Sequence, residues 1–150
     1  MSARSKRPTS KPRGVRLPDD LVDAVQRVAD ERGTTWSSAS SELLREAVRI
    51  REVPGVTFVD GPTGRRAVVG GTGIDVWQVI DAWNSVDRDE AATQASFPSL
   101  TPMQIRSALA YYGRFPEEID DRIAREESWT PERIRAEKPY LTPKPPRTES

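Results

Sequence analysis

The sequence predicts a mainly α protein with short β segments, and three observations support this fold class. Apolar residues recur at three- and four-residue spacing over most of positions 19–127, as in amphipathic helices. Strict alternation of apolar and polar residues, which is typical of strands, is confined to short stretches. Proline (13) and glycine (9) separate these stretches, so we expect many short elements rather than a few long ones.

The amino-acid composition excludes several classes of function. The 150 residues contain no Cys, which excludes disulfides, zinc–thiolate clusters and cysteine nucleophiles. They also contain no His, which removes the commonest general base and metal ligand. No run of 18 apolar residues and no signal-peptide pattern occurs. We expect a soluble, cytoplasmic protein that is not an enzyme, spans no membrane and uses no cofactor or metal.

The N-terminus predicts a basic disordered arm over residues 1–12. The first 16 residues contain no acid, although the whole chain has equal numbers of basic and acidic residues. Their basic residues are Arg4, Lys6, Arg7, Lys11, Arg13 and Arg16. Such a segment attracts polyanions. A merely solvated tail remains an equal alternative.

Residues 13–52 predict a first unit of one strand and two helices. Val15 and Leu17 alternate with Gly14 and Arg16, as in a short strand. A helix then begins at Pro18-Asp19-Asp20 and ends at Gly33, and Thr34 or Thr35 caps a second helix. The charged residues of the second helix, Glu42, Arg45, Glu46 and Arg49, are interpreted as a solvated face. So small a unit cannot bury enough surface alone, so we expect a homodimer.

Three segments of this unit resemble the ribbon-helix-helix family: Val15-Arg16-Leu17-Pro18-Asp19-Asp20-Leu21, Glu31-Arg32-Gly33-Thr34 and Ser41-Glu42-Leu43-Leu44-Arg45-Glu46-Ala47. The resemblance implies that strands from two protomers pair and enter the major groove of operator DNA. By position it makes Arg16 the main base-reading residue, with Arg13 and Lys11 on the adjoining basic arm. Pro12 and Gly14 replace the usual polar side chains of a reading strand. An alternative is therefore that this unit forms a dimer but recognises little DNA sequence.

Residues 55–127 predict a second unit that begins with a β-hairpin. Strands at 56–60 and 65–69 flank the turn Gly61-Pro62-Thr63-Gly64. Gly70-Gly71-Thr72-Gly73 lacks the Gly-Lys-Ser/Thr of a phosphate-binding loop, so we interpret it as a tight turn.

Four helices follow in this unit. The first starts at Asp75 and ends near Asn84, and Asp87 with Glu90 predicts a cap for a short helix to Ser96. Thr101, with Pro102 and Gln104, caps the third. Its predicted buried stripe is Ile105, Ala108, Leu109 and Tyr112, which leaves Gln104, Ser107 and Tyr111 on another face. A polar helix over 116–127 completes the unit, and the order of helices is helix-turn-helix-like.

Motifs in residues 56–126 resemble the family called "domain of unknown function 433". They are Gly71-Thr72-Gly73-Ile74-Asp75-Val76-Trp77, Phe97-Pro98-Ser99-Leu100-Thr101-Pro102-Met103-Gln104-Ile105 and Ala108-Leu109-Ala110-Tyr111-Tyr112. Gly73 stands where the family more often has Arg. The resemblance implies a small helix-turn-helix-like domain that is typically encoded beside a PIN-like ribonuclease as its antitoxin.

DNA contact by the third helix would use Gln104 and Arg106. However, the five arginines of residues 75–127 face more than twice as many acids, which opposes approach to phosphates. Packing or dimerisation is the favoured role of this unit.

The Pro-rich residues 128–150 predict a partner-binding tail with isolated apolar anchors among basic residues. The expected toxin-binding residues are Trp129, Arg133, Arg135, Tyr140 and Leu141. A frayed terminus with Trp129 against its own domain is the alternative.

Three functions follow from these patterns. The leading one is the antitoxin of a type II toxin–antitoxin pair, which binds a PIN-like ribonuclease stoichiometrically and represses its own operon. The second is a free-standing dimeric DNA-binding regulator. The third, least favoured, is a metal-dependent nuclease using Asp60, Asp75 or Asp120-Asp121, for which no base is evident.

Overall fold

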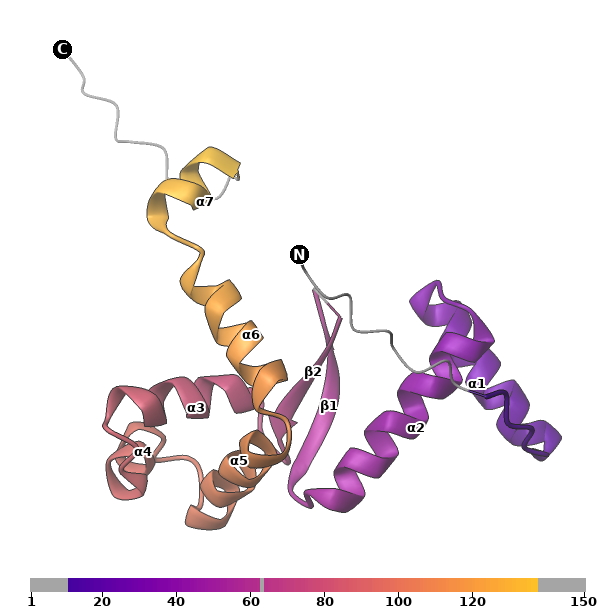
Figure 1. Ribbon diagram of the computed structural model, residues 1–150, viewed down its shortest axis with the longest axis horizontal. Coiled ribbons are helices and arrows are strands. Elements are labelled where there is room, and N and C mark those ends of the chain that lie inside the picture. Colours follow the sequence, from indigo (N-terminus) through magenta and orange to yellow (C-terminus); the bar gives the residue numbers. More distant parts are fainter. Residues whose placement is uncertain (1–10, 63, 138–150) are drawn as a thin grey trace, which may run out of the picture. The chain divides into compact units, whose positions relative to one another are not determined.

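The computed structural model describes residues 11–62 and 64–137 (Figure 1). This part of the chain is mainly helical with one antiparallel two-stranded hairpin, which confirms the predicted fold class. It divides into two compact units, and the division falls after Arg45, within a helix. The elements are α1 (Asp19–Arg32), α2 (Trp36–Glu52), β1 (Val56–Gly61), β2 (Gly64–Val69), α3 (Val76–Ser85), α4 (Glu90–Ser96), α5 (Pro102–Arg114), α6 (Pro116–Glu127) and α7 (Pro131–Glu137).

The ends of α1 and α2 lie where the sequence signals predict. Asp19 and Asp20 occupy the first turn of α1, where the helix dipole favours acids. Gly33 ends the helix in the left-handed conformation (φ 61°), which glycine adopts without steric cost. Thr35 Oγ1 accepts a hydrogen bond from the Ser38 amide at 3.1 Å and so caps α2.

The strand expected at Val15–Leu17 is not formed, because residues 11–18 have no regular structure. The physical reason is that a strand is held by hydrogen bonds to a neighbouring strand. A single chain has no strand available to pair with this segment among the described residues of its first unit.

The core of the first unit is small. Val25, Ala29 and Ala39 are its buried residues, and Val28, Trp36 and Leu43 pack against them. Trp36 Nε1 also donates to the Val22 carbonyl at 3.2 Å. So little buried apolar surface cannot provide much of the free energy that holds a unit folded.

The second unit includes the last turns of α2, which corrects the expected boundary near 53–55. Val53 is 3% exposed and belongs to the core of the second unit. The Gly70 amide donates to the Gly55 carbonyl at 2.7 Å, and Ser107 Oγ donates to the Pro54 carbonyl at 3.3 Å. These contacts fix the segment, so it is part of the folded unit and not a linker.

The hairpin pairs Val56 with Val69 and continues in register to Gly61 and Gly64. Each strand is one residue longer than predicted, so only residues 62–63 connect them. The glycine-rich stretch after β2 is a tight turn, as expected, because the Val69 amide donates to the Ile74 carbonyl at 2.9 Å. The turn leads directly to Asp75, which caps α3 in a capping box with Gln78.

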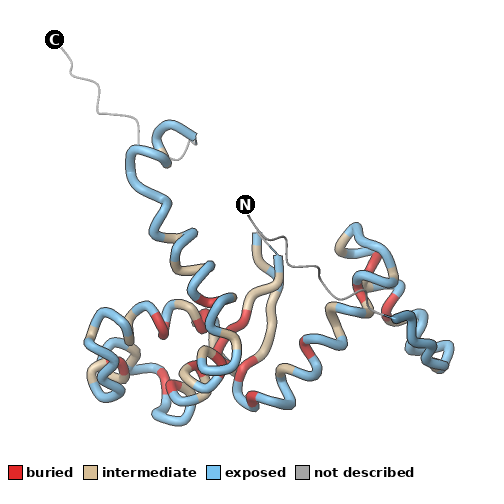
Figure 2. The backbone as a smooth tube through the Cα atoms, in the orientation of Figure 1, coloured by how far each residue is buried: buried red, intermediate tan, exposed pale blue. Residues whose placement is uncertain are grey.

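The main core lies between the hairpin and the helices α3, α5 and α6, where the buried positions of Figure 2 gather. Its members come from each of these elements, from the residue that follows α2 and from the break before α5. They are Val53, Val56, Ala67, Val69, Val76, Val79, Ile80, Leu100, Ile105, Ala108, Tyr111 and Ile119. The helices α3, α4 and α5 contact one another, and residues 97–101 form the break before α5. Among the described residues, no helix is both long enough and apolar enough to cross a bilayer.

Two local predictions in this unit are wrong. The cap of α4 is Asp89, whose carboxylate accepts from the Ala92 amide, whereas Asp87 (φ 54°) lies in the preceding turn. Tyr111, expected on an outer face of α5, is fully buried. Its burial is explained by α6 and the last turns of α2, which place polar partners for its hydroxyl inside the unit.

Candidate functional site

The basic residues predicted to bind DNA lie in the irregular segment before α1. Lys11, Arg13 and Arg16 are exposed, and none of them forms an ion pair with another described residue. Their positive charge is therefore available to an external anion. Residues 11–18 form no strand in the single chain, so these side chains do not have the alternating arrangement with which a strand contacts bases.

Apolar side chains on the first two helices are exposed. On α2, Leu44 (68% exposed) and Val48 (55%) lie one turn apart and form what we call the α2 apolar face. On α1, Leu21 and Val22 are also exposed, as is Val15 before the helix. These side chains leave apolar surface on α1 and α2 in contact with solvent in a single chain.

The two residues predicted to bind DNA on α5 have structural partners. Gln104 Oε1 accepts from the Thr101 amide at 2.8 Å, and Nε2 donates to the Gly70 carbonyl at 3.2 Å. Both ends of its amide are used in these contacts, so Gln104 serves as a capping residue of α5, and its contact with DNA stays a prediction. Arg106 is exposed and pairs with Glu90 at 2.8 Å.

The predicted toxin-binding residues fall on and before α7. Thr130 Oγ1 accepts from the Arg133 amide at 3.2 Å and so caps α7. None of the α7 residues is buried, and Figure 1 shows α7 beyond the end of α6. Trp129 is 37% exposed, and the Arg133 guanidinium lies 5.1 Å from the centroid of its ring.

The remaining tail predictions divide between described and undescribed positions. Arg133 also pairs with Glu137 at 2.8 Å, and Arg135 pairs with Glu132 at 3.4 Å. Both arginines stay at the surface of α7. Tyr140 and Leu141 lie outside the described residues.

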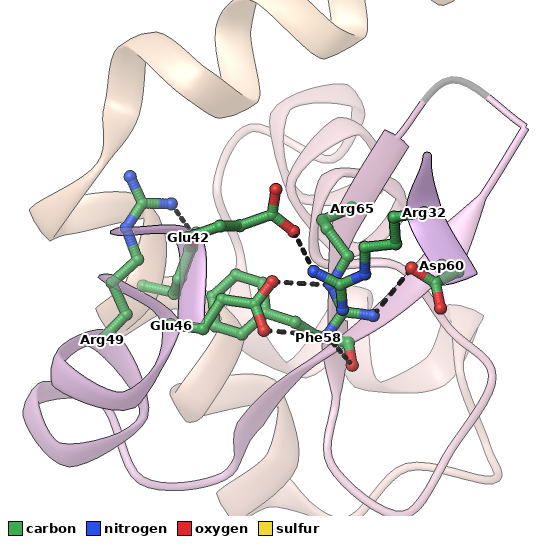
Figure 3. Close-up of polar contacts among 8 residues, drawn as sticks. Arg32, Glu42, Glu46, Arg49, Phe58, Asp60 and Arg65 are labelled. Carbon is green, nitrogen blue, oxygen red and sulfur yellow. Dashed lines mark hydrogen bonds and ion pairs between the residues drawn. The ribbon is translucent and has the colours of Figure 1, made fainter. Parts of the chain in front are cut away.

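A polar network around Arg65, which no sequence pattern predicts, joins α2 to the hairpin (Figure 3). Arg65 donates from Nε and Nη2 to the two carboxylate oxygens of Glu46, at 2.6 and 2.8 Å. It also donates to Asp60 Oδ1 and to the Phe58 carbonyl, each at 3.1 Å. The hydrogen bonds to Glu46 raise the pKa of the Arg65 guanidinium. A bidentate pair of this kind is a positioning contact.

A second missed network centres on Tyr111. Its hydroxyl donates to Glu118 Oε1 at 2.9 Å and accepts from Arg49 Nη1 at 2.9 Å, while Arg49 also pairs with Glu118. Burial and the Glu118 carboxylate raise the pKa of Tyr111. Burial acts to lower the pKa of Arg49, but Glu118 and Tyr111 outweigh it and the net shift is upward.

These networks overturn the interpretation of α2 as having a solvated charged face. Glu46 is buried and Arg49 is half-buried, because within the second unit Glu46 pairs with Arg65 and Arg49 contacts Tyr111 and Glu118. The sequence does contain complementary charges that could have predicted these pairs. Glu46 and Arg49 lie on α2, and their partners Arg65 and Glu118 lie on β2 and α6. Sequence alone does not show which charges form ion pairs, because Glu46 and Arg65 are 19 positions apart and Arg49 and Glu118 are 69 positions apart.

The acids considered for a nuclease lie in separate contacts. Asp60 pairs with Arg65, and Asp75 bonds Arg66 and Trp77 Nε1. Asp120 accepts from the Tyr112 hydroxyl at 2.9 Å, which raises the pKa of Tyr112. In residues 11–62 and 64–137, no three acidic side chains converge in the manner of a metal site.

A small pocket opens between β2, the start of α3 and α6, with a volume of about 80 Å³. Arginines dominate its lining: Arg65, Arg66, Arg122 and Arg125, together with Trp77 and Glu118. No sequence pattern indicates this pocket, because the arginines of β2 and those of α6 are far apart along the chain.

These features define a small, mainly helical protein in which a two-stranded hairpin and the helices α3, α5 and α6 share one core. Residues 57–112 match a family described as "Protein of unknown function (DUF433)", which confirms the family resemblance over the hairpin and α3–α5. No curated protein and no solved structure matches the chain at a significant level.

Proposed function

We propose that this protein is the antitoxin of a type II toxin–antitoxin pair. In this role a cytoplasmic homodimer binds a PIN-like ribonuclease stoichiometrically and represses its own operon. The observation that carries the proposal is α7, a capped helix with no buried residue that follows the folded core. A helix that gains nothing from its own core is typical of a segment that packs on a partner.

The chemistry of this segment suits an acidic partner. Trp129 supplies an aromatic anchor, and Arg133 and Arg135 supply guanidinium groups on an exposed helix. Aromatic and arginine side chains are the commonest sources of binding energy in protein interfaces. A ribonuclease that holds Mg²⁺ with carboxylates offers a complementary surface.

Autorepression would depend on the first unit. The α2 apolar face favours a second copy of this chain, because the unit has only three buried residues of its own. Pairing of two copies would also give residues 15–17 the neighbouring strand that they lack in one chain. Lys11, Arg13 and Arg16 would then lie on or beside a two-stranded ribbon that can enter a major groove.

The antitoxin proposal is tested by co-expression with the neighbouring reading frame. We expect full-length protein to relieve growth arrest and to leave a sizing column together with the toxin. Truncation after Glu127 should abolish both effects. Arg133→Gln should weaken the complex, whereas Arg27→Gln should not, because Arg27 is an exposed arginine on α1 with no hydrogen bond or ion pair to another described residue. An unchanged complex after truncation would remove α7 from the interface.

A second candidate is a free-standing DNA-binding regulator, which the exposed and unpaired Lys11, Arg13 and Arg16 favour. Gel-shift titration with the DNA upstream of the gene distinguishes it. DNA binding that Arg16→Gln weakens and Arg27→Gln does not, together with no toxin binding, would support this candidate over the antitoxin.

A further inference from the structure

The pocket of about 80 Å³ beside α6 has an excess of positive charge that the fold does not use. Two of its charged groups are already satisfied. Arg65 donates hydrogen bonds to Glu46, Asp60 and the Phe58 carbonyl. Glu118 pairs with Arg49 and accepts a hydrogen bond from the Tyr111 hydroxyl. The pocket's character therefore depends on its other three arginines.

Those three arginines differ in how they are paired. Arg66 Nη1 bonds Asp75, and Arg122 Nη2 bonds Glu126 at 2.7 Å. Arg125 has no carboxylate partner among the described residues, and its hydrogen bond runs from Nε to the Asp121 carbonyl at 3.2 Å. The Arg125 guanidinium therefore brings an uncompensated positive charge to the pocket.

A buried donor in the same lining also lacks an acceptor. Arg66 Nε is removed from solvent and has no hydrogen-bond acceptor among the described residues. A buried donor without an acceptor destabilises a folded protein, and such groups are rare. The described residues therefore do not use all the donors of the Arg66 guanidinium.

We propose that this pocket binds one phosphate ion. A phosphate offers up to four acceptor oxygens, which suits guanidinium donors from β2 and α6 better than the two oxygens of a carboxylate. The volume admits a single small anion and not a nucleotide. The acids of α6, among them Glu117, Asp120 and Asp121, repel a long polyanion more than a small ion. The site does not depend on the antitoxin role.

The test titrates inorganic phosphate into the full-length protein at constant ionic strength, with chloride replaced ion for ion. The readouts are calorimetry and the NMR signals of the arginine Nε–H groups. We expect saturable binding and a shift of the Arg66 signal. Arg125→Gln should weaken binding about tenfold or more, because it removes a charge-assisted contact. Arg51→Gln, an exposed arginine on α2, should leave binding unchanged.

Arg125 is exposed, so its replacement should leave the fold intact, which thermal unfolding checks. Three results would overturn the proposal. They are a linear response without saturation, equal weakening by Arg125→Gln and Arg51→Gln, and binding of acetate as tight as that of phosphate. Binding of an oligonucleotide at this pocket without binding of phosphate would also overturn it.

Discussion

At the scale of single residues, Tyr111 shows how a polar group becomes part of the core. Its side chain is fully buried, and its hydroxyl is satisfied on both sides, by Glu118 and Arg49. Phe58 and Phe115 lie against its ring, with centroids 6.2 and 4.9 Å away. The residue thus joins β1, α5, α6 and the end of α2 through one ring and one hydroxyl.

The raised pKa of Tyr111 gives a pH prediction. An unfolded tyrosine ionises near pH 10, and the folded pKa lies higher, so folding favours the protonated hydroxyl. Its contribution is complete below about pH 10 and is lost as the pH rises toward the folded pKa. Tyr111→Phe should cost about 1–2 kcal/mol at pH 7 by loss of hydrogen bonds to charged groups. Denaturant unfolding from pH 7 to 11 should show the difference from wild type shrinking above pH 10.

Tyr112→Phe is the control for this measurement. Tyr112 also has a raised pKa, through its hydrogen bond to Asp120, but its side chain is half-buried. Its replacement should change the alkaline loss of stability less than Tyr111→Phe does. A difference between wild type and Tyr111→Phe that stays constant up to pH 11 would contradict the coupling of Tyr111 to Glu118.

Sequence reasoning placed single residues well where the signal is local. The Thr101 cap and the Gly33 terminus depend on neighbours within a few positions, and both were predicted. Tyr111 and Gln104 were placed wrongly, because their partners lie far along the chain. Helical spacing gives the faces of α5 but not which face α6 and the Gly70 turn cover.

At the scale of elements, the turn between α2 and β1 determines how the last turns of α2 join the second unit. Gly55 has a φ of 98°, which side chains other than glycine rarely adopt, and a Cβ there would lie 2.5 Å from Ser107 Oγ. Gly70 approaches the same turn through its hydrogen bond to the Gly55 carbonyl. The turn is thus built around one glycine and one serine.

Gly55→Ala should destabilise the protein by about 1–3 kcal/mol, from backbone strain and the contact with Ser107. Adding Ser107→Ala should recover only part of this loss, since the φ strain remains. Gly113→Ala on α5 is the matched control: its φ is not positive and a Cβ there meets no atom within 4 Å. It should be neutral or stabilising by up to about 1 kcal/mol. Equal unfolding midpoints for the two alanine variants would show that the turn is unstrained.

The hairpin and the helices α3, α5 and α6 follow from the sequence because local start and stop signals mark each of them. The structure of the residues before α1 does not follow from the sequence. Val15–Leu17 show the alternation of a strand, but the sequence does not show which strand would pair with them. The division of the chain within α2 was missed for a related reason. A helix that packs in one core and forms ion pairs in the other unit shows one continuous pattern, and Val53-Pro54-Gly55 looks like a linker until its contacts are known.

At the scale of the whole molecule, the two units differ in how complete they are. The second has a core drawn from the hairpin, α3, α5 and α6, whereas the first has three buried residues and several exposed aliphatic ones. In a single chain, apolar side chains of α1 and α2 are therefore exposed to solvent. Association of two copies through the α2 apolar face would remove it from water.

This argument gives a test by charge insertion. Leu44 is 68% exposed, so in a monomer Leu44→Glu would change the free energy of unfolding little. In a dimer packed through the α2 apolar face, the buried carboxylate would raise the dissociation constant about tenfold or more. Met103→Glu is the control, because Met103 is a comparably exposed apolar residue (74%) on α5. Sedimentation at micromolar concentration should show dimers for wild type and Met103→Glu and monomers for Leu44→Glu. Loss of the dimer in Met103→Glu alone would place the contact on α5, and a monomeric wild type would exclude self-association as the cover of α2.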